Sequence, residues 1–458
     1  MNDLLNRQII HYQKALLIKQ NNTEIYSKLA ELYYKQGQID DAFEMYDLLG
    51  IRLVKEGRLE EAVSVYRYII EVKPDAYKAY YSLGEVLQEL QQWHEAIYCY
   101  FQVLSLYQEH LKAEAIFEQS YFKLINIQNN CSLQEAICAY RKIIEEQPDL
   151  YLAYLNLGDL LTQEGKLEEA ISCYQMASYK KLLGSHAMAS YKKLLGSHAE
   201  FAKNYWNSQN RRIPNFLIVG IGKGGTSSLY YYLEKHPQIL PAIRKEIHFF
   251  SENSERGLDW YLSHFPPIPK ESNFLTGEAT PWYLVSYGAE KKVASIFPNI
   301  KIIILLRNPI LRAFSQYQMQ LKFAGEQRSF AEVISSEIEA IKNFSSPGEV
   351  DSDYWQTEKG YLFFGLYFYF IEKWMTVFPR EQFLILKSED FYANPAVTLT
   401  QVFEFLGVPD YSLAEYPNYN PGSYNPISDD LRQTLAEFFR PHNQKLEEYL
   451  GMKFNWDE

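Results

Sequence analysis

The segment with the most specific chemistry in this chain of 458 residues is a glycine-rich turn between an apolar run and a helical stretch. The run at 216–219 leads through Gly220-Ile-Gly into Lys223-Gly224-Gly225-Thr226-Ser227-Ser228. Glycines let backbone N–H groups converge on an anion, and the start of a helix adds unsatisfied donors and partial positive charge. Together with the Lys223 ammonium and three hydroxyls, they predict a site for a phosphate or sulfate group.

The turn differs from the two common nucleotide-binding loops. A Walker A loop needs a Ser or Thr directly after its lysine to hold Mg²⁺, whereas here Gly224 follows Lys223. No acidic residue is clearly placed downstream for a dinucleotide-binding fingerprint. A P-loop hydrolase or kinase stays an alternative, as does a helical-repeat scaffold with an inactive C-terminal domain.

A second cation follows another apolar run. Arg307 comes directly after 302–306, and Ser315 lies about two turns further along a helical stretch. Because the carboxyl ends of strands in an open α/β sheet face the ligand crevice, Arg307 and Ser315 can clamp a second phosphate there. A salt bridge that only stabilises the strand end is the alternative interpretation.

Glu246 and His248 lie two positions apart, beside Phe249 and Phe250. In an extended chain the two side chains share a side. An apolar surrounding raises the pKa of a carboxyl group, which suits a general base. An exposed glutamate with an ordinary structural histidine is the alternative interpretation.

Three short apolar runs predict the elements that would position these residues. The runs at 216–219, 302–306 and 383–386 are rich in β-branched or bulky residues, and helical patterns separate them. This arrangement is typical of buried parallel strands. Residues 213–458 are therefore expected to form an α/β domain with a central parallel sheet, similar to P-loop folds.

Residues 1–175 read as helical throughout and contain an internal repeat. An acidic residue precedes each of five alanines, and a tyrosine follows each alanine by four positions. The alanines are Ala42, Ala62, Ala96, Ala136 and Ala170, and the tyrosines are Tyr46, Tyr66, Tyr100, Tyr140 and Tyr174. The pattern resembles the tetratricopeptide repeat (TPR), a superhelix of antiparallel helix pairs about 34 residues long. The resemblance implies four to five units and a concave surface for a partner protein; a generic helical bundle is the alternative.

Two irregularities interrupt this pattern. The repeat spacing predicts an insertion near 126–132. The sequence MASYKKLLGSHA at 176–187 recurs residue for residue at 188–199. No helix or strand geometry demands a perfect copy of this length. Residues 176–212 are expected to be a helical linker with a tandem duplication, and contact of this basic peptide with a membrane or partner is the alternative.

The C-terminal motifs together resemble a known family. They include Lys-Glu-Ile-His-Phe-Phe at 245–250, Gly-Leu-Asp-Trp-Tyr at 257–261, Gly-Glu-Ala-Thr-Pro-Trp-Tyr at 277–283, and Leu-Arg-Asn-Pro at 306–309 with Arg312 and Ser315. In this order they resemble the sulfotransferases that use 3′-phosphoadenosine 5′-phosphosulfate (PAPS). The branch that contains heparan-sulfate N- and O-sulfotransferases and their bacterial relatives is the most similar, and the resemblance covers residues 213–455.

The resemblance implies how the donor would be bound. The loop at 223–228 would hold the 5′-phosphosulfate, and its lysine would offset charge on the leaving group. Arg307 and Ser315 would hold the 3′-phosphate. Gly422 and the aromatic Tyr424 lie in a segment that closes over the nucleotide in relatives, although here it lacks two basic residues of the family pattern.

The resemblance also implies the roles at the acceptor side. Glu246 would take the proton from a hydroxyl or amine acceptor, with a glycan as the expected acceptor. His248 would support Glu246 or contact the acceptor. The family carries a lysine after the acid at position 278, whereas here Ala279 follows Glu278.

Composition limits the remaining classes of function. The formal net charge is −12, which argues against nucleic acid as a partner. The four cysteines lack metal-ligand spacing, and a transferred sulfuryl group carries less charge than a phosphoryl group, so no metal is expected. The chain opens with polar and acidic residues, and its longest apolar run is too short to span a bilayer. These features predict a cytoplasmic protein without a transmembrane segment.

Overall fold

The structure, a computed structural model, describes residues 2–19, 22–107, 120, 123–124, 131–184, 214–268, 272–323, 325–342, 360–417 and 427–456. Contacts between residues divide the chain into two compact units, Met1–Ala170 and Ile171–Glu458. Each unit is described separately below.

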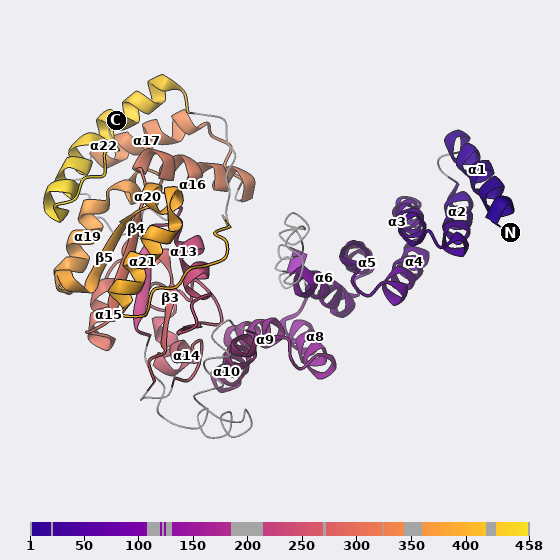
Figure 1. Cartoon of the computed structure of the whole chain (residues 1–458), viewed down its shortest axis with the longest axis horizontal. Helices are drawn as coiled ribbons and strands as arrows, with labels where there is room; N and C mark the ends of the chain where they lie inside the picture. The colour runs from indigo at the N-terminus through magenta and orange to yellow at the C-terminus, as the bar shows by residue number, and fades with distance from the viewer. Residues whose placement is uncertain are drawn as a thin grey trace. The chain divides into compact units, whose positions relative to one another are not determined.

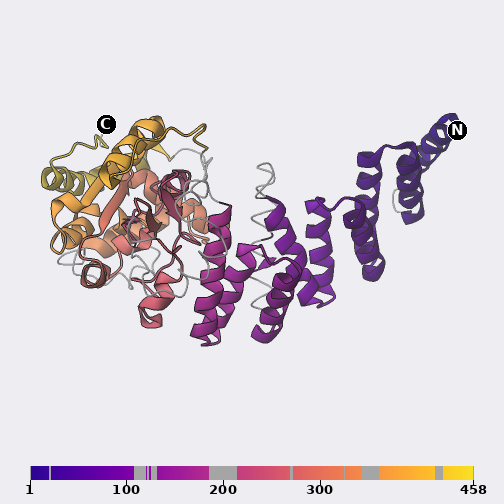
Figure 2. The ribbon, with the colours of Figure 1, turned by 60° about the horizontal axis from the view of Figure 1, so that its bottom comes forward.

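The first unit is built from helices that follow one another along the chain (Figures 1 and 2). They are α1 (Asn2–Ile18), α2 (Thr23–Gln36), α3 (Ile39–Lys55), α4 (Leu59–Val72), α5 (Tyr77–Glu89), α6 (Trp93–Tyr107), α8 (Leu133–Glu146), α9 (Tyr151–Gln163) and α10 (Leu167–Leu183), which continues into the second unit. Neighbouring helices contact each other, as α2 does α3 and α5 does α6. The predicted arrangement of stacked helix pairs is confirmed. The predicted insertion near 126–132 falls almost entirely outside the described residues.

Close helix crossings explain the repeated residues. Ala62 and Ala96 are completely buried, and so is Tyr100. A Cβ atom added to Gly84 would lie 2.9 Å from Cζ of Tyr100, and one added to Gly50 would lie 2.5 Å from Cζ of Tyr66. Each tyrosine therefore packs on a glycine of the preceding helix, where any side chain would push the two helices apart.

Two of the repeated acidic residues, Glu95 and Glu169, form ion pairs between repeats. Arg67 forms an ion pair with Glu95 of the next repeat, and Arg141 pairs with Glu169 at 3.0 Å. The side chains in both pairs are about half exposed, so each pair contributes only about 0.2–1 kcal/mol. The pairs mainly favour one register between adjacent repeats.

The second unit contains a five-stranded parallel sheet in the order β2-β3-β1-β4-β5. The strands are β1 (Phe216–Gly220), β2 (Ile239–Pro241), β3 (Leu275–Ala279), β4 (Lys301–Leu306) and β5 (Phe383–Lys387). The three predicted strands correspond to β1, β4 and β5, and the predicted central parallel sheet is confirmed. The strands β2 and β3 were not predicted.

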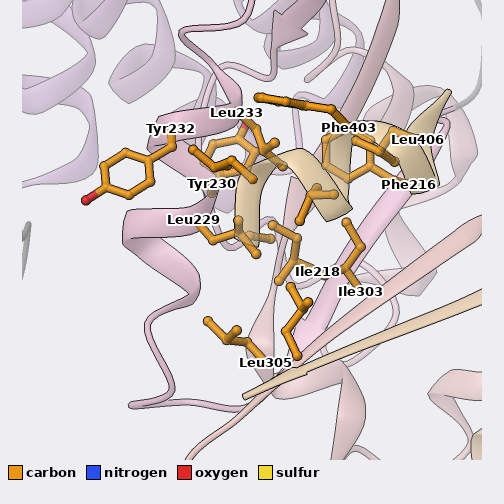
Figure 3. Close-up of a cluster of buried hydrophobic side chains, with 14 of the residues drawn as sticks. Phe216, Ile218, Leu229, Tyr230, Tyr232, Leu233, Ile303, Leu305, Phe403 and Leu406 are labelled. Atoms are coloured by element: carbon orange, nitrogen blue, oxygen red, sulfur yellow. The ribbon is translucent and has the colours of Figure 1, made fainter. Parts of the chain in front are cut away.

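Helices surround this sheet. They are α13 (Thr226–Leu233), α14 (Leu258–Leu262), α15 (Ala289–Ile296), α16 (Pro309–Phe323), α17 (Phe330–Lys342), α19 (Tyr367–Met375), α20 (Ser388–Ala393), α21 (Pro395–Leu406) and α22 (Asp429–Leu450). Leu229 of α13 and Phe403 of α21 belong to one buried cluster with Ile218 and Ile303 of the sheet (Figure 3). The 3-10 turn η2 (Pro281–Leu284) contacts β1 and α19, and Trp374 Nε1 of α19 donates to the Leu284 carbonyl at 3.2 Å.

The first copy of the duplicated peptide is helical as far as Leu183, at the end of α10. Its Leu182 is buried with Leu240, Ile268 and Phe274, and Lys181 pairs with Glu234 at 2.8 Å. This part of the predicted linker is therefore packed on the second unit. Residues 185–213, including the second copy, lie outside the described residues, and the domain boundaries at 175 and 213 stay predictions.

Candidate active site

The predicted site residues lie where the parallel strands end. The loop at 220–225 follows β1, Arg307 follows β4, and the loop that contains Glu246 and His248 comes after β2. Parallel strands present their carboxyl ends at one edge of the sheet, and this edge is the usual ligand position in open α/β sheets. The topology therefore brings together segments that are far apart in the sequence.

Hydrogen bonds attach the glycine-rich loop to the sheet. The Ile221 N–H donates to the Leu305 carbonyl of β4 at 2.9 Å, and the Gly224 N–H donates to the Ile221 carbonyl at 2.9 Å. The Ser388 hydroxyl donates to the Gly224 carbonyl. The Gly224 N–H is thus used within the loop, whereas the first-turn amides of α13, from Thr226 onward, have no acceptor within the helix and can donate to an anion.

Lys223 and Arg307 lie next to each other. Nη1 of Arg307 donates to the Lys223 carbonyl at 3.1 Å, and the Tyr367 hydroxyl donates to the Arg307 carbonyl at 2.7 Å. Neither cation forms an ion pair with a carboxylate of the described residues. Burial lowers the pKa of Lys223, and the positive charges of Arg307 and Arg312 lower it further. An anion bound here would relieve this repulsion, as expected of an anion site.

The predicted hydroxyl donors are close to the same loop. Thr226 and Ser228 are buried and Ser227 is half-buried at the start of α13. Ser315 is 6% exposed on α16, the helix that begins two residues after Arg307. Gly422 and Tyr424 lie outside the described residues, so their predicted contact with the nucleotide stays a prediction.

Glu246 and His248 lie close together, but the chain between them is not extended. His248 Nε2 lies 3.8 Å from Glu246 Oε2, and its Nδ1 lies 3.3 Å from Glu252 Oε1. The Lys245 ammonium contacts the Glu246 carboxylate directly. Both Glu246 and His248 adopt left-handed backbone angles, with φ of 63° and 57°. The expectation of an extended segment was therefore wrong, although the two side chains do meet.

The electrostatics of Glu246 also differ from the expectation. Burial favours the neutral carboxyl, but His248 and Lys245 outweigh burial and lower the pKa of Glu246 to about 2. The predicted rise in this pKa was wrong, because the sequence did not show that two cationic side chains would surround the carboxylate. For His248, burial opposes protonation, but Glu246 and Glu252 raise its pKa overall. The pair therefore favours an ionised glutamate beside a protonated histidine.

Backbone strain is concentrated at the predicted catalytic residues. Five non-glycine residues of the described chain have positive φ: Gln91, Lys223, Glu246, His248 and Asn455. The left-handed region costs a side-chain-bearing residue about 1–2 kcal/mol. Three of the five are the residues predicted to act in catalysis, and strained backbone of this kind is enriched at functional sites.

Sequence reasoning missed three side chains around the site. Lys245 was recognised only as a member of the motif at 245–250. Met319 Sδ of α16 lies 3.7 Å from Lys223 Nζ. The side chain of Tyr392 forms a hydrogen bond with that of Ser228. The Tyr392 hydroxyl also lies 2.8 Å from the position that a Cβ atom on Gly225 would occupy. Met319 and Tyr392 carry no motif that could have revealed them, whereas Lys245 lies directly beside Glu246 in the sequence.

Two wider properties of the described residues bear on the site. No group of three or more His, Cys, Asp or Glu side chains in the described ranges is arranged to hold a metal ion. Among the helices that the structure describes, none combines the length and apolar character that a bilayer crossing requires.

Comparison with known proteins identifies the family. The family model described as "Sulfotransferase domain" matches residues 214–432, and tetratricopeptide repeat models match residues 25–52, 48–105 and 151–179. The heparan sulfate glucosamine 3-O-sulfotransferase 6 of Mus musculus is 30% identical over 54% of this chain and 75% of its own length. The chain therefore belongs to the sulfotransferase family, and its N-terminal unit carries tetratricopeptide repeats.

Two further relatives are matched over less of their own length. The "Membrane-associated sulfotransferase kil1" of Dictyostelium discoideum is 27% identical over 53% of this chain and 66% of that protein. The "Bifunctional heparan sulfate N-deacetylase/N-sulfotransferase 3" of Homo sapiens is 32% identical over 54% of this chain and 31% of that protein. The chain thus spans less than two thirds of these two relatives.

Proposed function

We propose that the C-terminal unit transfers a sulfuryl group from 3′-phosphoadenosine 5′-phosphosulfate to a hydroxyl or amine, with a glycan as acceptor. The observation that carries the proposal is the adjacency of Lys223 and Arg307, joined by a 3.1 Å hydrogen bond and without a carboxylate partner among the described residues. Two neighbouring cations, one on the glycine-rich loop and one directly after β4, favour a ligand with more than one anionic group. A nucleotide with a 3′-phosphate and a 5′-phosphosulfate has this character.

Different residues of the chain would have different roles in this reaction. When bound, the donor supplies the sulfuryl group that the reaction transfers. Lys223 and the first-turn amides of α13 would offset negative charge at the transfer site, and Arg307 with Ser315 would hold the 3′-phosphate. Transfer of this kind depends mostly on positioning and charge stabilisation.

Glu246 would accept the proton of the acceptor. Its lowered pKa keeps it ionised and available, but a weak base of this kind takes a proton only once the attacking oxygen or nitrogen has become acidic. Lys245 contacts the same carboxylate, so the acceptor group must share or replace that contact. His248 would keep the carboxylate oriented toward the acceptor.

The N-terminal repeats would recruit a protein partner or the acceptor to the enzyme. Stacked helical repeats expose extended surfaces that suit such binding, and they bring no chemistry of their own.

The glycan acceptor follows from the relatives, two of which are named for heparan sulfate. All four cysteines are free thiols, which supports the cytoplasmic location in this proposal.

The test is transfer of radiolabelled sulfate from PAPS to a panel of glycans, lipids and proteins. Lys223→Ala and Glu246→Gln are each expected to reduce turnover by about 10²-fold or more. The exposed residues Lys291 and Glu381 provide matched controls, and Lys291→Ala and Glu381→Gln should keep wild-type rates. Wild-type rates in the Lys223 and Glu246 variants would remove these two assignments.

One binding measurement and one activity measurement separate the alternatives. Calorimetry with adenosine 3′,5′-bisphosphate is expected to show binding by the wild type, whereas a folded protein without any binding heat would indicate a scaffold with an inactive domain. Turnover of ATP that depends on Mg²⁺ would instead indicate a P-loop hydrolase or kinase.

A further inference from the structure

Glu278, at the end of β3, is a completely buried carboxylate held by hydroxyl groups. Tyr261 and Tyr283 each donate to its Oε1 at 2.9 Å, and Thr280 donates to its Oε2 at 2.6 Å. Within the described part of the chain it forms no ion pair. Because a buried carboxylate is unfavourable unless hydrogen bonds satisfy it, a residue of this kind invites a functional explanation.

The hydrogen bonds of this carboxylate extend to the loop that carries Glu246 and His248. The Ile247 N–H favours the ionised form of the Glu278 carboxyl. The Tyr283 hydroxyl, which donates to Glu278, also accepts the Phe249 N–H at 2.9 Å. Directly beside them, the Glu246 N–H donates to the Ala279 carbonyl at 2.9 Å. Three amides within four consecutive residues are thus attached to β3 and the turn that follows it.

This attachment has a conformational consequence. Glu246 and His248 adopt left-handed backbone angles that residues with side chains rarely adopt unless their surroundings impose them. The Ile247 amide, between them, interacts with the Glu278 carboxylate, and the Phe249 amide donates to the Tyr283 hydroxyl that Glu278 accepts. Without this acceptor, the loop could relax to an ordinary backbone conformation, and the Glu246 carboxylate would point elsewhere.

We propose that Glu278 is a positioning residue, which acts through Tyr283 and the Ile247 amide to hold Glu246 in the orientation that accepts the acceptor proton. The proposal rests on the proposed function, because it assigns Glu278 a part in that reaction. It explains why a charged side chain is retained at the buried end of β3. It also separates Glu278 from the donor site, since neither Lys223 nor Arg307 is among its contacts.

Two buried tyrosines provide a matched pair of variants. Tyr261 and Tyr283 are both completely buried, and both donate to the same oxygen of Glu278 at the same distance. Of the two hydroxyls, it is that of Tyr283 that accepts the Phe249 amide. Tyr283→Phe should therefore release the loop, whereas Tyr261→Phe removes an equivalent hydrogen bond without releasing it.

The first measurement is sulfate transfer from PAPS, with kcat and the acceptor KM determined separately. Tyr283→Phe is expected to lower kcat by about tenfold or more, because misplaced catalytic groups lose most of their effect. Binding of adenosine 3′,5′-bisphosphate should change by less than about threefold in calorimetry. Tyr261→Phe should keep kcat within about threefold of wild type. Equal losses of kcat in the two variants would overturn the proposal, because they would indicate a general effect on folding.

The second measurement does not need activity. Hydrogen exchange of a peptide covering 246–250 should become faster in Tyr283→Phe and in Glu278→Gln, and should stay at the wild-type rate in Tyr261→Phe. Unchanged exchange in both Tyr283→Phe and Glu278→Gln would overturn the positioning role. If the wild-type protein transfers no sulfate at all, the proposed function fails, and this contrast still decides whether Glu278 holds the loop.

Discussion

The glycine-rich loop allows a sharp test of the donor site, because two of its glycines differ in the space around them. A Cβ on Gly224 would lie 2.7 Å from the Leu305 carbonyl oxygen and 2.9 Å from that of Ile221. A Cβ on Gly222 would meet no atom within 4 Å. Neither glycine has a positive φ, so alanine carries no penalty for a left-handed backbone at either position. Gly224→Ala and Gly222→Ala therefore differ in whether the new Cβ atom collides with backbone carbonyl oxygens.

The size of the effect follows from that collision. Both obstructing atoms are backbone oxygens, which cannot turn away as a flexible side chain can, so the loop itself must move. Overpacking of this kind costs about 1–3 kcal/mol. If that cost falls on the bound conformation, the affinity for the nucleotide drops by about 5–150-fold, since 1.4 kcal/mol is about a factor of ten. Gly222→Ala should change the affinity by less than about twofold.

The assay is calorimetric titration with adenosine 3′,5′-bisphosphate, with thermal unfolding of each variant as a control. Gly224→Ala should bind at least about five times more weakly than Gly222→Ala while both remain folded at the assay temperature. Equal affinities would refute the reasoning, because they would show that the packing of the loop on β4 does not shape the nucleotide site.

The remaining two predictions concern stability. The pKa of Glu246 is lowered from 4.5 to about 2, so its ionised form stabilises the fold above pH 4.5, and this contribution is lost as the pH falls toward 2. Between pH 6 and pH 3, the free energy of urea unfolding should fall by about 1 kcal/mol more in the wild type than in Glu246→Gln, a value already reduced because the side chain is partly exposed. A greater fall in the variant would contradict the sign of this prediction. Leu182→Ala should lower the free energy of unfolding of the second unit by about 2–4 kcal/mol, because this side chain is buried. The control Leu258→Ala, at an exposed position, should have a free energy of unfolding within about 0.5 kcal/mol of wild type. Equal changes in the two variants would argue against the packing of α10.

The sequence predicts the strands that are continuously apolar and misses the two that are not. β1, β4 and β5 are runs of bulky residues, and such runs alone indicate strands that are buried on both faces of a sheet. β2 has only three residues and ends in Pro241, and β3 contains Thr276, Gly277 and Glu278 among its five. Its charged residue is satisfied by the hydroxyls of Thr280, Tyr283 and Tyr261, and a local pattern does not show that these side chains turn toward the carboxylate.

The site shows the same division between local and tertiary information. The glycine-rich loop and Arg307 could be predicted because each follows an apolar run, and strand order then brings both to one edge. The surroundings of Glu246 could not, because its pKa depends on Lys245 and His248 in a left-handed turn that no propensity favours. For the repeats, the alanine and tyrosine spacing was readable, whereas the packing of Tyr66 on Gly50 and of Tyr100 on Gly84 emerged only from the structure.

Two unfavourable terms coincide at Lys223, and a single cause accounts for both. Its backbone has a φ of 71°, and its ammonium lies among desolvated positive charges that lower its pKa. A residue selected for stability alone would avoid the strain, since glycine adopts this angle freely, and would avoid the charge, since a neutral side chain would remove the repulsion from Arg307. Retaining a lysine in this conformation favours stability only when an anion occupies the loop. Glu246 and His248 also lie in a strained turn, which hydrogen bonds attach to β3 and the turn that follows it. In the proposed reaction, the unliganded protein would therefore already hold the groups on the donor and acceptor sides in place.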